Sequence, residues 1–243
     1  MIVIFSSFSM AAYPQQEIEY SLFYQDKVIG EQRVSISYLP SNLEQPLGGR
    51  IIEVYTEINE DASKLGGYAQ RSTAHFSGKQ IKFVSASNKN NEKRELQGRL
   101  LNNEKWLVHD IQSDNTSVHE YSLSELELPS IAFYDPVLSQ LLLEKSNTSI
   151  YFIEHGILVD GVWNSKGEEK HKVSRKKIVG ERYKFSSNVA YEGVWSDTGL
   201  LLSWKMPYDE IIIEAKVRSL PEKPDFGTIE SIKSFEGVQE EEL

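Results

Sequence analysis

The architecture follows from one run of residues, Asp135-Pro136-Val137-Leu138-Ser139-Gln140-Leu141-Leu142-Leu143-Glu144-Lys145. Asp135 suits the N-cap of a helix and Pro136 suits its first position, so these two residues predict a structural helix cap. Apolar residues recur at four-residue spacing after the proline, which gives the helix a broad apolar face. The sequence predicts no other helix, so this face must pack against strands.

Most of the remaining sequence alternates between apolar and polar residues with a period of two, as strands with one buried face do. The alternation begins near Glu17 and continues to about Val217. Turn residues such as Gln25-Asp26-Lys27 separate the runs. We therefore predict a mainly β fold, an antiparallel open (half) β-barrel of about 11 strands with one helix packed in its concave face.

The chain is expected to have three parts: a signal peptide over residues 1–12, the barrel domain over 13–221 and an acidic tail over 222–243. Residues 1–12 carry no charged side chain and are mostly apolar, and Ser9-Met10-Ala11 fits a small-x-small cleavage site. The stretch is shorter than the roughly 20 residues that span a bilayer, so no stable membrane span is expected. We predict export to a bacterial periplasm; the alternative is a buried first strand.

Composition excludes several kinds of protein. The chain has 243 residues, no cysteine and a formal net charge of -10. Without cysteine there are no disulfides, thiol nucleophiles or thiolate metal sites. The negative charge argues against a nucleic acid partner, which requires a basic face. The sequence also has no phosphate loop and no metal-ligand spacing, so no cofactor, metal site or catalytic residue is predicted.

One basic stretch lies in this acidic chain. Its cations are candidates for contact with anionic lipid headgroups or a partner protein, namely Lys170, Lys172, Arg175, Lys176 and Lys177. The alternative is a solvated edge strand whose lysines prevent edge-to-edge pairing.

Large apolar side chains are candidates for lining a ligand groove. They are Trp106, Trp163, Trp195, Trp204, Leu138 and Leu142. The alternative is that they fill the core between sheet and helix, as most such side chains do.

Histidines beside carboxylates, as in His109-Asp110, suggest a base or a metal ligand. Adjacent residues on a strand point to opposite faces, however, so such a pair does not form a site by itself. His109 and His119 remain as two residues that a turn between them can bring together.

Three stretches carry a family resemblance. They are the helix entry Tyr134-Asp135-Pro136-Val137-Leu138-Ser139, the opening hairpin Tyr24-Gln25-Asp26-Lys27-Val28-Ile29-Gly30-Glu31 and the closing hairpin Val194-Trp195-Ser196-Asp197-Thr198-Gly199-Leu200. Together they resemble an uncharacterised family of exported bacterial β-rich proteins, a domain of unknown function similar to the LolA/LolB-like open β-barrel superfamily. The resemblance covers about residues 16–220 and implies an unclosed barrel around a helical plug in the periplasm. It implies no catalytic residues.

The leading hypothesis is a non-catalytic periplasmic protein that binds an apolar ligand, a lipidated protein or another envelope protein in the half-barrel groove. One alternative is an envelope assembly or scaffold factor that acts through a sheet edge or the acidic tail. Another is an enzyme of unknown reaction that uses His109 or His119. The sequence leaves the oligomeric state open.

Overall fold

The computed structural model describes residues 15–39, 49–59, 66–77, 80–101, 105–112, 115–122, 127–145, 147–208 and 211–221. The predicted signal peptide over 1–12 and the predicted tail over 222–243 lie outside these residues. The described part of the chain contains a 15-stranded sheet, one short 3-10 helix and one α-helix.

The first eight strands follow one another as antiparallel neighbours. They are β1 (Gln15–Tyr24), β2 (Lys27–Leu39), β3 (Gly49–Ile58), β4 (Tyr68–Ser77), β5 (Gln80–Lys89), β6 (Glu92–Leu101), β7 (Lys105–Gln112) and β8 (Asn115–Ser122). Buried residues alternate with more exposed ones along β4, as the period of two predicts. Between β1 and β2 the turn residues Gln25 and Asp26 have φ angles of 48° and 63°, the conformation that two-residue hairpins favour.

The second half of the chain contains the helices and the remaining strands. These are β9 (Glu127–Pro129), the 3-10 helix η2 (Ser130–Tyr134), α1 (Pro136–Glu144), β10 (Thr148–Phe152), β11 (Ile157–Val173), β12 (Lys176–Ser186), β13 (Tyr191–Ser196), β14 (Leu201–Tyr208) and β15 (Ile211–Ser219). Strand neighbours are antiparallel except β9 and β10, which are parallel.

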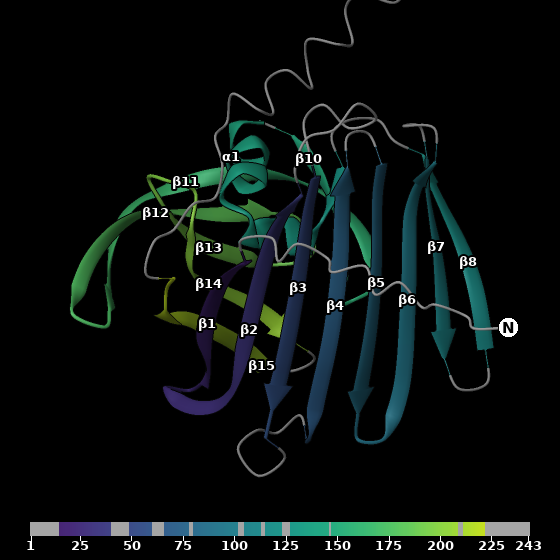
Figure 1. Ribbon diagram of the computed structural model, residues 1–243, viewed down its shortest axis with the longest axis horizontal. Coiled ribbons are helices and arrows are strands. Elements are labelled where there is room, and N and C mark those ends of the chain that lie inside the picture. The colour runs from purple at the N-terminus through teal and green to yellow at the C-terminus, as the bar shows by residue number, and fades with distance from the viewer. Residues whose placement is uncertain are drawn as a thin grey trace, which may run out of the picture.

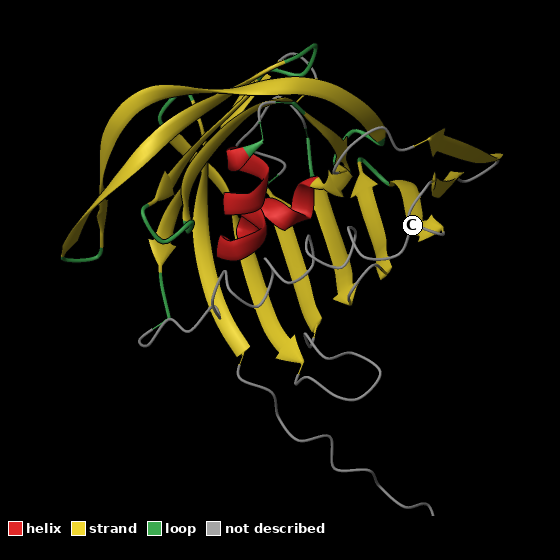
Figure 2. Cartoon of the chain, turned by 90° about the horizontal axis from the view of Figure 1, so that it is seen from above, coloured by secondary structure: helices red, strands yellow, loops and turns green. Residues whose placement is uncertain are grey.

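The strands form one sheet in the order β8-β7-β6-β5-β4-β3-β2-β1-β15-β14-β13-β12-β11-β10-β9. The first described strand therefore pairs with the last, and the two edges are β8 and β9. The sheet bends strongly, and α1 lies inside the bend (Figures 1 and 2). This agrees with the prediction of an open, mainly β architecture with one α-helix.

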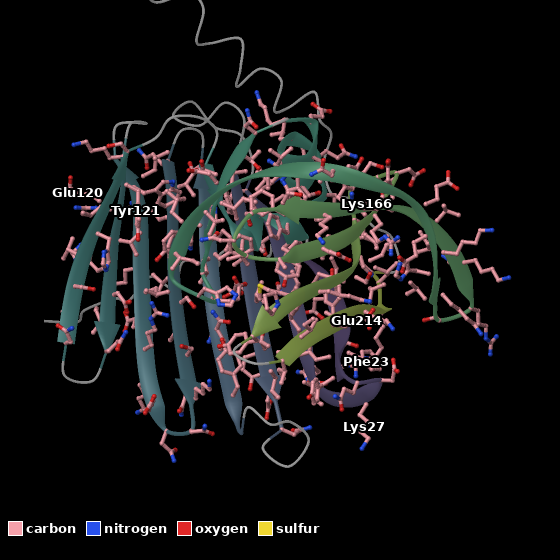
Figure 3. The ribbon with its side chains drawn as sticks, turned by 180° about the vertical axis from the view of Figure 1, so that it is seen from behind. Phe23, Lys27, Glu120, Tyr121, Lys166 and Glu214 are labelled. Carbon is pink, nitrogen blue, oxygen red and sulfur yellow. The ribbon has the colours of Figure 1, made fainter. Side chains whose placement is uncertain are left out.

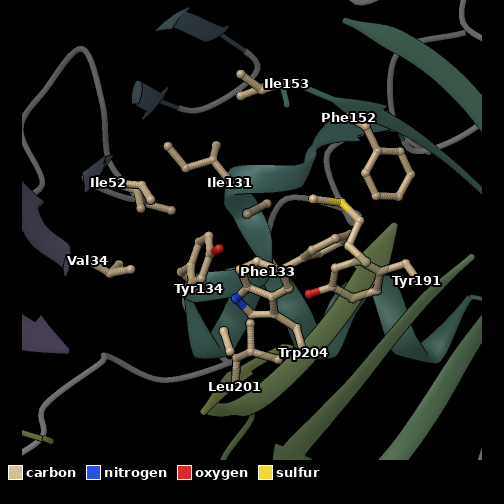
Figure 4. Packing of buried hydrophobic residues seen from close by; sticks show 14 of the residues in the cluster. Val34, Ile52, Ile131, Phe133, Tyr134, Phe152, Ile153, Tyr191, Leu201 and Trp204 are labelled. Atoms are coloured by element: carbon tan, nitrogen blue, oxygen red, sulfur yellow. The ribbon is translucent and has the colours of Figure 1, made fainter. Parts of the chain in front are cut away.

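The core lies between the concave face of the sheet and the plug formed by η2 and α1. Phe133 and Tyr134 of η2 are buried and point into a cluster that includes Trp204 and Tyr191 from the second half of the sheet (Figure 4). Val34 and Ile52 face the same cluster from β2 and β3. Burying such side chains contributes about 1.5–3 kcal/mol each, so the plug joins the two halves of the sheet.

The predicted number of about 11 strands was too low. β9 has only three residues, too few to give a period-two pattern. Before the turn between β11 and β12 more buried residues alternate with exposed ones, but the run Glu168-Glu169-Lys170-His171-Lys172 is polar on both faces, so the alternation in hydropathy that predicts a strand is weak there. A strand count based on regularly spaced period-two runs therefore misses strands at both places.

The end of the β11–β12 hairpin, residues 168–181, extends beyond its neighbours; we call it the ribbon. β10 pairs with β11 only as far as Gly161, and β13 pairs with β12 only from Gly180 onward. The hairpin is strongly curved (Figures 1 and 2), and β11 contacts β15 beyond its pairing with β10. The predicted basic residues lie on this ribbon, where each of the two strands is paired on one side only, as the edge-strand alternative expects.

Candidate functional site

The plug is fixed by a buried carboxylate at its N-terminus. Asp135 Oδ1 accepts hydrogen bonds from the amides of Val137 (2.9 Å) and Leu138 (3.0 Å) at the start of α1. The other oxygen, Oδ2, lies 2.9 Å from Arg50 Nε on β3. The Asp135 side chain is fully buried, and this burial raises the pKa of its carboxyl group, while Arg50 and the two amides favour the charged form. Asp135 therefore caps the helix and also ties it to the sheet.

A row of polar side chains crosses the inner face of the sheet. Gln32 Nε2 on β2 donates to Thr56 Oγ1 on β3 at 3.0 Å. Tyr134 and Trp204 both donate to Gln32 Oε1, at 3.0 Å and 3.3 Å. On β4, Gln70 Nε2 donates to Ser85 Oγ at 2.9 Å. These buried groups therefore satisfy one another, as buried polar groups must.

The inner cavity beside this row is small. Its volume is about 30 Å³, and its lining includes Gln32, Gln70, Ser130 and Glu154 together with aromatic side chains. Ser130 Oγ donates to Glu154 Oε2 at 2.7 Å. Such a volume holds about two water molecules. This cavity has no room for an acyl chain.

A larger hollow, open to solvent, lies beside the plug, between the C-terminal half of α1 and the plug-facing side of strands β12 and β13. Its volume is about 730 Å³, within the usual range for ligand sites. Apolar lining comes from Leu143 on α1 and from Val179 and Tyr183 on β12, with buried Trp195 of β13 beside them. Val179 is 45% exposed, so much of its surface is available for contact. We call this hollow the outer groove.

Carboxylates dominate the charged lining of the outer groove near α1. Glu144 on the helix, Asp197 after β13 and the opposed pair Glu168 and Glu181 line it together with a single lysine, Lys177. The Tyr183 hydroxyl donates to Glu181 Oε2 at 3.1 Å. Like charges on directly opposed residues of neighbouring strands are destabilising. An occupant with positive charge at this end would relieve that repulsion.

The charge reverses toward the tip of the ribbon. Lys172 and Lys177 are directly opposed there, four residues from the Glu168 and Glu181 pair on each strand. The five predicted cations, Lys170, Lys172, Arg175, Lys176 and Lys177, are all exposed on the ribbon. None of them forms an ion pair with another described side chain. The ribbon therefore runs from an acidic end near α1 to a basic tip.

Of the six residues predicted to line a ligand groove, two line a hollow and four lie in the core. All six are buried. Trp204 lines the inner cavity and Trp195 lines the outer groove. Trp106, Trp163, Leu138 and Leu142 line neither and belong to the core.

The two histidines considered for catalysis do not meet. His109 on β7 is opposite Val118 on β8, while His119 is opposite Val108. The two residues are thus one position out of register, and their side chains point to opposite faces of the sheet. The described residues also contain no cluster of three or more potential metal ligands. This register removes the basis for an enzyme that uses His109 and His119 together.

Sequence reasoning missed Gln32, Gln70 and Arg50. Gln32 and Gln70 stand at inward positions of their strands, in period-two phase with buried Val34 and Ala74. A polar residue at a position where the alternation expects an apolar one was the signal that could have identified them. The pairing of Arg50 with Asp135 had no local indication, because it depends on how β3 lies against the plug.

Comparisons with known proteins bear on the fold. No protein-family model matches the chain, and no curated protein matches its sequence. Among solved structures, it is similar to a β-barrel-like protein of a domain of unknown function, DUF1849, from Brucella abortus. The TM-score is 0.57 and the sequence identity 11%, over 86% of this chain and 97% of that chain.

At this identity the likeness shows the fold alone, that of a bacterial β-rich domain of unknown function. The relationship to the LolA/LolB carriers stays a prediction. No helix in the described part of the chain combines the length and the apolarity that crossing a membrane requires.

Proposed function

We propose that this chain is a non-catalytic binding protein that holds an amphipathic segment of a partner polypeptide in the outer groove. The contrast between the two hollows carries this proposal. The inner cavity measures about 30 Å³ and the outer groove about 730 Å³, so of these two hollows the groove is the one that can accept more than solvent. The proposal keeps the leading hypothesis from sequence, a site between helix and sheet, and places it at the open groove beside α1.

The charges of the groove specify the partner segment. Apolar contact is available at Leu143, Val179 and Tyr183. The opposed Glu168 and Glu181 favour a cation near α1, and the opposed lysines at the ribbon tip favour an anion there. Electrostatic complementarity of this kind fixes the direction in which a segment lies and accelerates its association. The fitting segment is therefore basic at one end, apolar in the middle and acidic at the other.

We also propose that the protein is exported and acts in the bacterial cell envelope. The support is the uncharged, apolar composition of residues 1–12 and the small-x-small run Ser9-Met10-Ala11. In such a setting the partner is another envelope protein, in line with the assembly or scaffold alternative.

Site-specific photo-crosslinking in living cells tests the groove. A photoreactive p-benzoylphenylalanine at Val179 is expected to give one discrete adduct of higher mass. The same residue at Val84 is the matched control, because Val84 is 48% exposed but lies on β5, in the other half of the sheet. The absence of an adduct at Val179, or equal adducts at both positions, would overturn the proposal.

Charge reversal tests the predicted direction of the partner. We expect the adduct at Val179 to be lost when Glu168→Lys and Glu181→Lys are added, because the cation of the partner then meets like charge. Glu57→Lys with Glu92→Lys changes the net charge equally at exposed positions on β3 and β6 and should leave the adduct intact. Loss with both pairs would indicate an effect of net charge rather than of the groove.

A further inference from the structure

The edge strand β8 lacks a partner on one side among the described residues. It pairs with β7 over its whole length, from Asn115 opposite Gln112 to Ser122 opposite Lys105, with no irregularity in the register. The other edge of the β8 backbone therefore presents a straight row of amide and carbonyl groups. Glu120 and Tyr121 mark this strand at the margin of the sheet (Figure 3).

The sequence of β8 has none of the usual devices that prevent strands from pairing at an edge. Its residues are Asn115-Thr116-Ser117-Val118-His119-Glu120-Tyr121-Ser122. The run has no proline, lysine or arginine and a single carboxylate, whereas protected edges typically use charges, prolines or bulges. The opposite edge, β9, is only three residues long, ends at Pro129 and continues directly into the plug. One edge is thus blocked and the other is open.

We infer that β8 pairs antiparallel with β8 of a second copy of this chain, about a two-fold axis through Val118. Directly opposed residues of two strands must face the same side of the sheet. With two identical strands, the axis must therefore pass through a residue and not between two residues. Centring it on Val118 places the two most exposed apolar side chains of the edge, each 53% exposed, against each other.

The rest of this register is compatible in charge and shape. Thr116 lies opposite Glu120, Ser117 opposite His119 and Asn115 opposite Tyr121, so no two like charges are opposed. A register centred on His119 would instead oppose two imidazoles and leave Val118 opposite a carboxylate. The Val118 register therefore fits best, and a two-fold axis makes the interface self-complementary.

The neighbouring strand extends the apolar contact. His109 is opposite Val118, so Leu107 and Ile111, two residues to either side on β7, share the face of Val118. Both are half-buried. His109 lies between them, so pairing of the two edges makes a mixed face to which Leu107, Ile111 and the Val118 pair contribute the apolar surface. The inference is independent of the proposed function, because the outer groove lies on β12 and β13.

Cysteine scanning tests this register directly, because the chain contains no cysteine. In the proposed pairing the two Val118 Cα atoms are about 4.5–5.5 Å apart, within the range of about 4.4–6.8 Å that a disulfide bridges. Under mild oxidation, Val118→Cys should give a disulfide-linked dimer at least about tenfold faster than Val84→Cys. Val84 is similarly exposed, but both edges of its strand are paired.

Two further variants distinguish this register from random collision. Thr116→Cys and Glu120→Cys should each cross-link slowly alone, because identical residues at these positions lie about 13 Å apart in the dimer. An equimolar mixture should cross-link rapidly, because Thr116 of one copy is opposite Glu120 of the other. Equal rates for Val118→Cys and Val84→Cys, or no gain on mixing, would overturn the inference.

The oligomeric state of the unmodified chain gives a second readout. Sedimentation equilibrium should show a dimer that dissociates on dilution. Val118→Lys places two like charges at the axis and should shift the chain to monomer, with its far-ultraviolet circular dichroism unchanged. An unmodified chain that stays monomeric at its highest soluble concentration would also overturn the inference.

Discussion

At the scale of single residues, the pair Asp135 and Arg50 holds the plug in the sheet. The Asp135 side chain has no exposed surface and that of Arg50 has 11%. A charge so far removed from water is strongly destabilising unless it is paired. The stability of the pair therefore depends on both partners being present.

A double-mutant cycle measures this dependence. Arg50→Met leaves a buried carboxylate without its counter-ion and should lower the free energy of unfolding by about 3–5 kcal/mol. Asp135→Asn keeps an oxygen that can accept from the amides of Val137 and Leu138 but leaves Arg50 unpaired. The double variant should lose clearly less than the sum of the single losses, as measured by urea denaturation. Additive losses would show that the two side chains do not act as a pair.

At the scale of elements, α1 is held by the turn between β13 and β14. Ser139 Oγ donates to the carbonyl oxygen of Gly199 in this turn at 2.7 Å. Gly199 has a φ angle of +80°, and a Cβ atom there would lie 2.1 Å from the carbonyl oxygen of Pro136. The close approach of the turn to the first residue of the helix thus requires glycine.

A comparison of alanine variants at two glycines separates the loss of stability caused by backbone conformation from the loss caused by this close contact. Gly167 also has a positive φ, +91°, but a Cβ atom there would meet nothing within 4 Å. Alanine at either position costs about 1–2 kcal/mol for the left-handed conformation. Gly199→Ala should lose more than Gly167→Ala in urea denaturation, because it also pushes α1 away from the turn. Equal losses would mean that the turn does not position the helix.

The elements show how far the sequence predicts this fold. The capped helix and most strands follow from local patterns, because Asp135, Pro136 and the period-two alternation act over a few neighbouring residues. Sheet order does not follow in this way. The pairing of β1 with β15, the contact between Arg50 and Asp135 and the outer groove each join segments that are distant in sequence. The groove also depends on the curvature of the ribbon. The sequence marks the ribbon only by its basic residues, and these do not predict its curvature.

At the scale of the whole molecule, the proposed export has a direct test. When the full chain is produced in a bacterium, the periplasmic fraction should contain a protein that lacks about the first 12 residues, in accord with the Ser9-Met10-Ala11 run. Intact-mass spectrometry of that fraction measures the cleavage. Full-length protein confined to the cytoplasm would contradict export.

The pairing of β1 with β15 also governs the order in which the sheet can be completed. A chain that emerges N-terminus first from a ribosome presents Tyr20 long before Val217, its partner across the β1–β15 ladder, has been made. Until then β1 has only β2 beside it, and its other side is open to wrong partners. Closing so long a loop is entropically costly and makes folding slow. The β1–β15 ladder therefore cannot form until nearly all of the strands have been made.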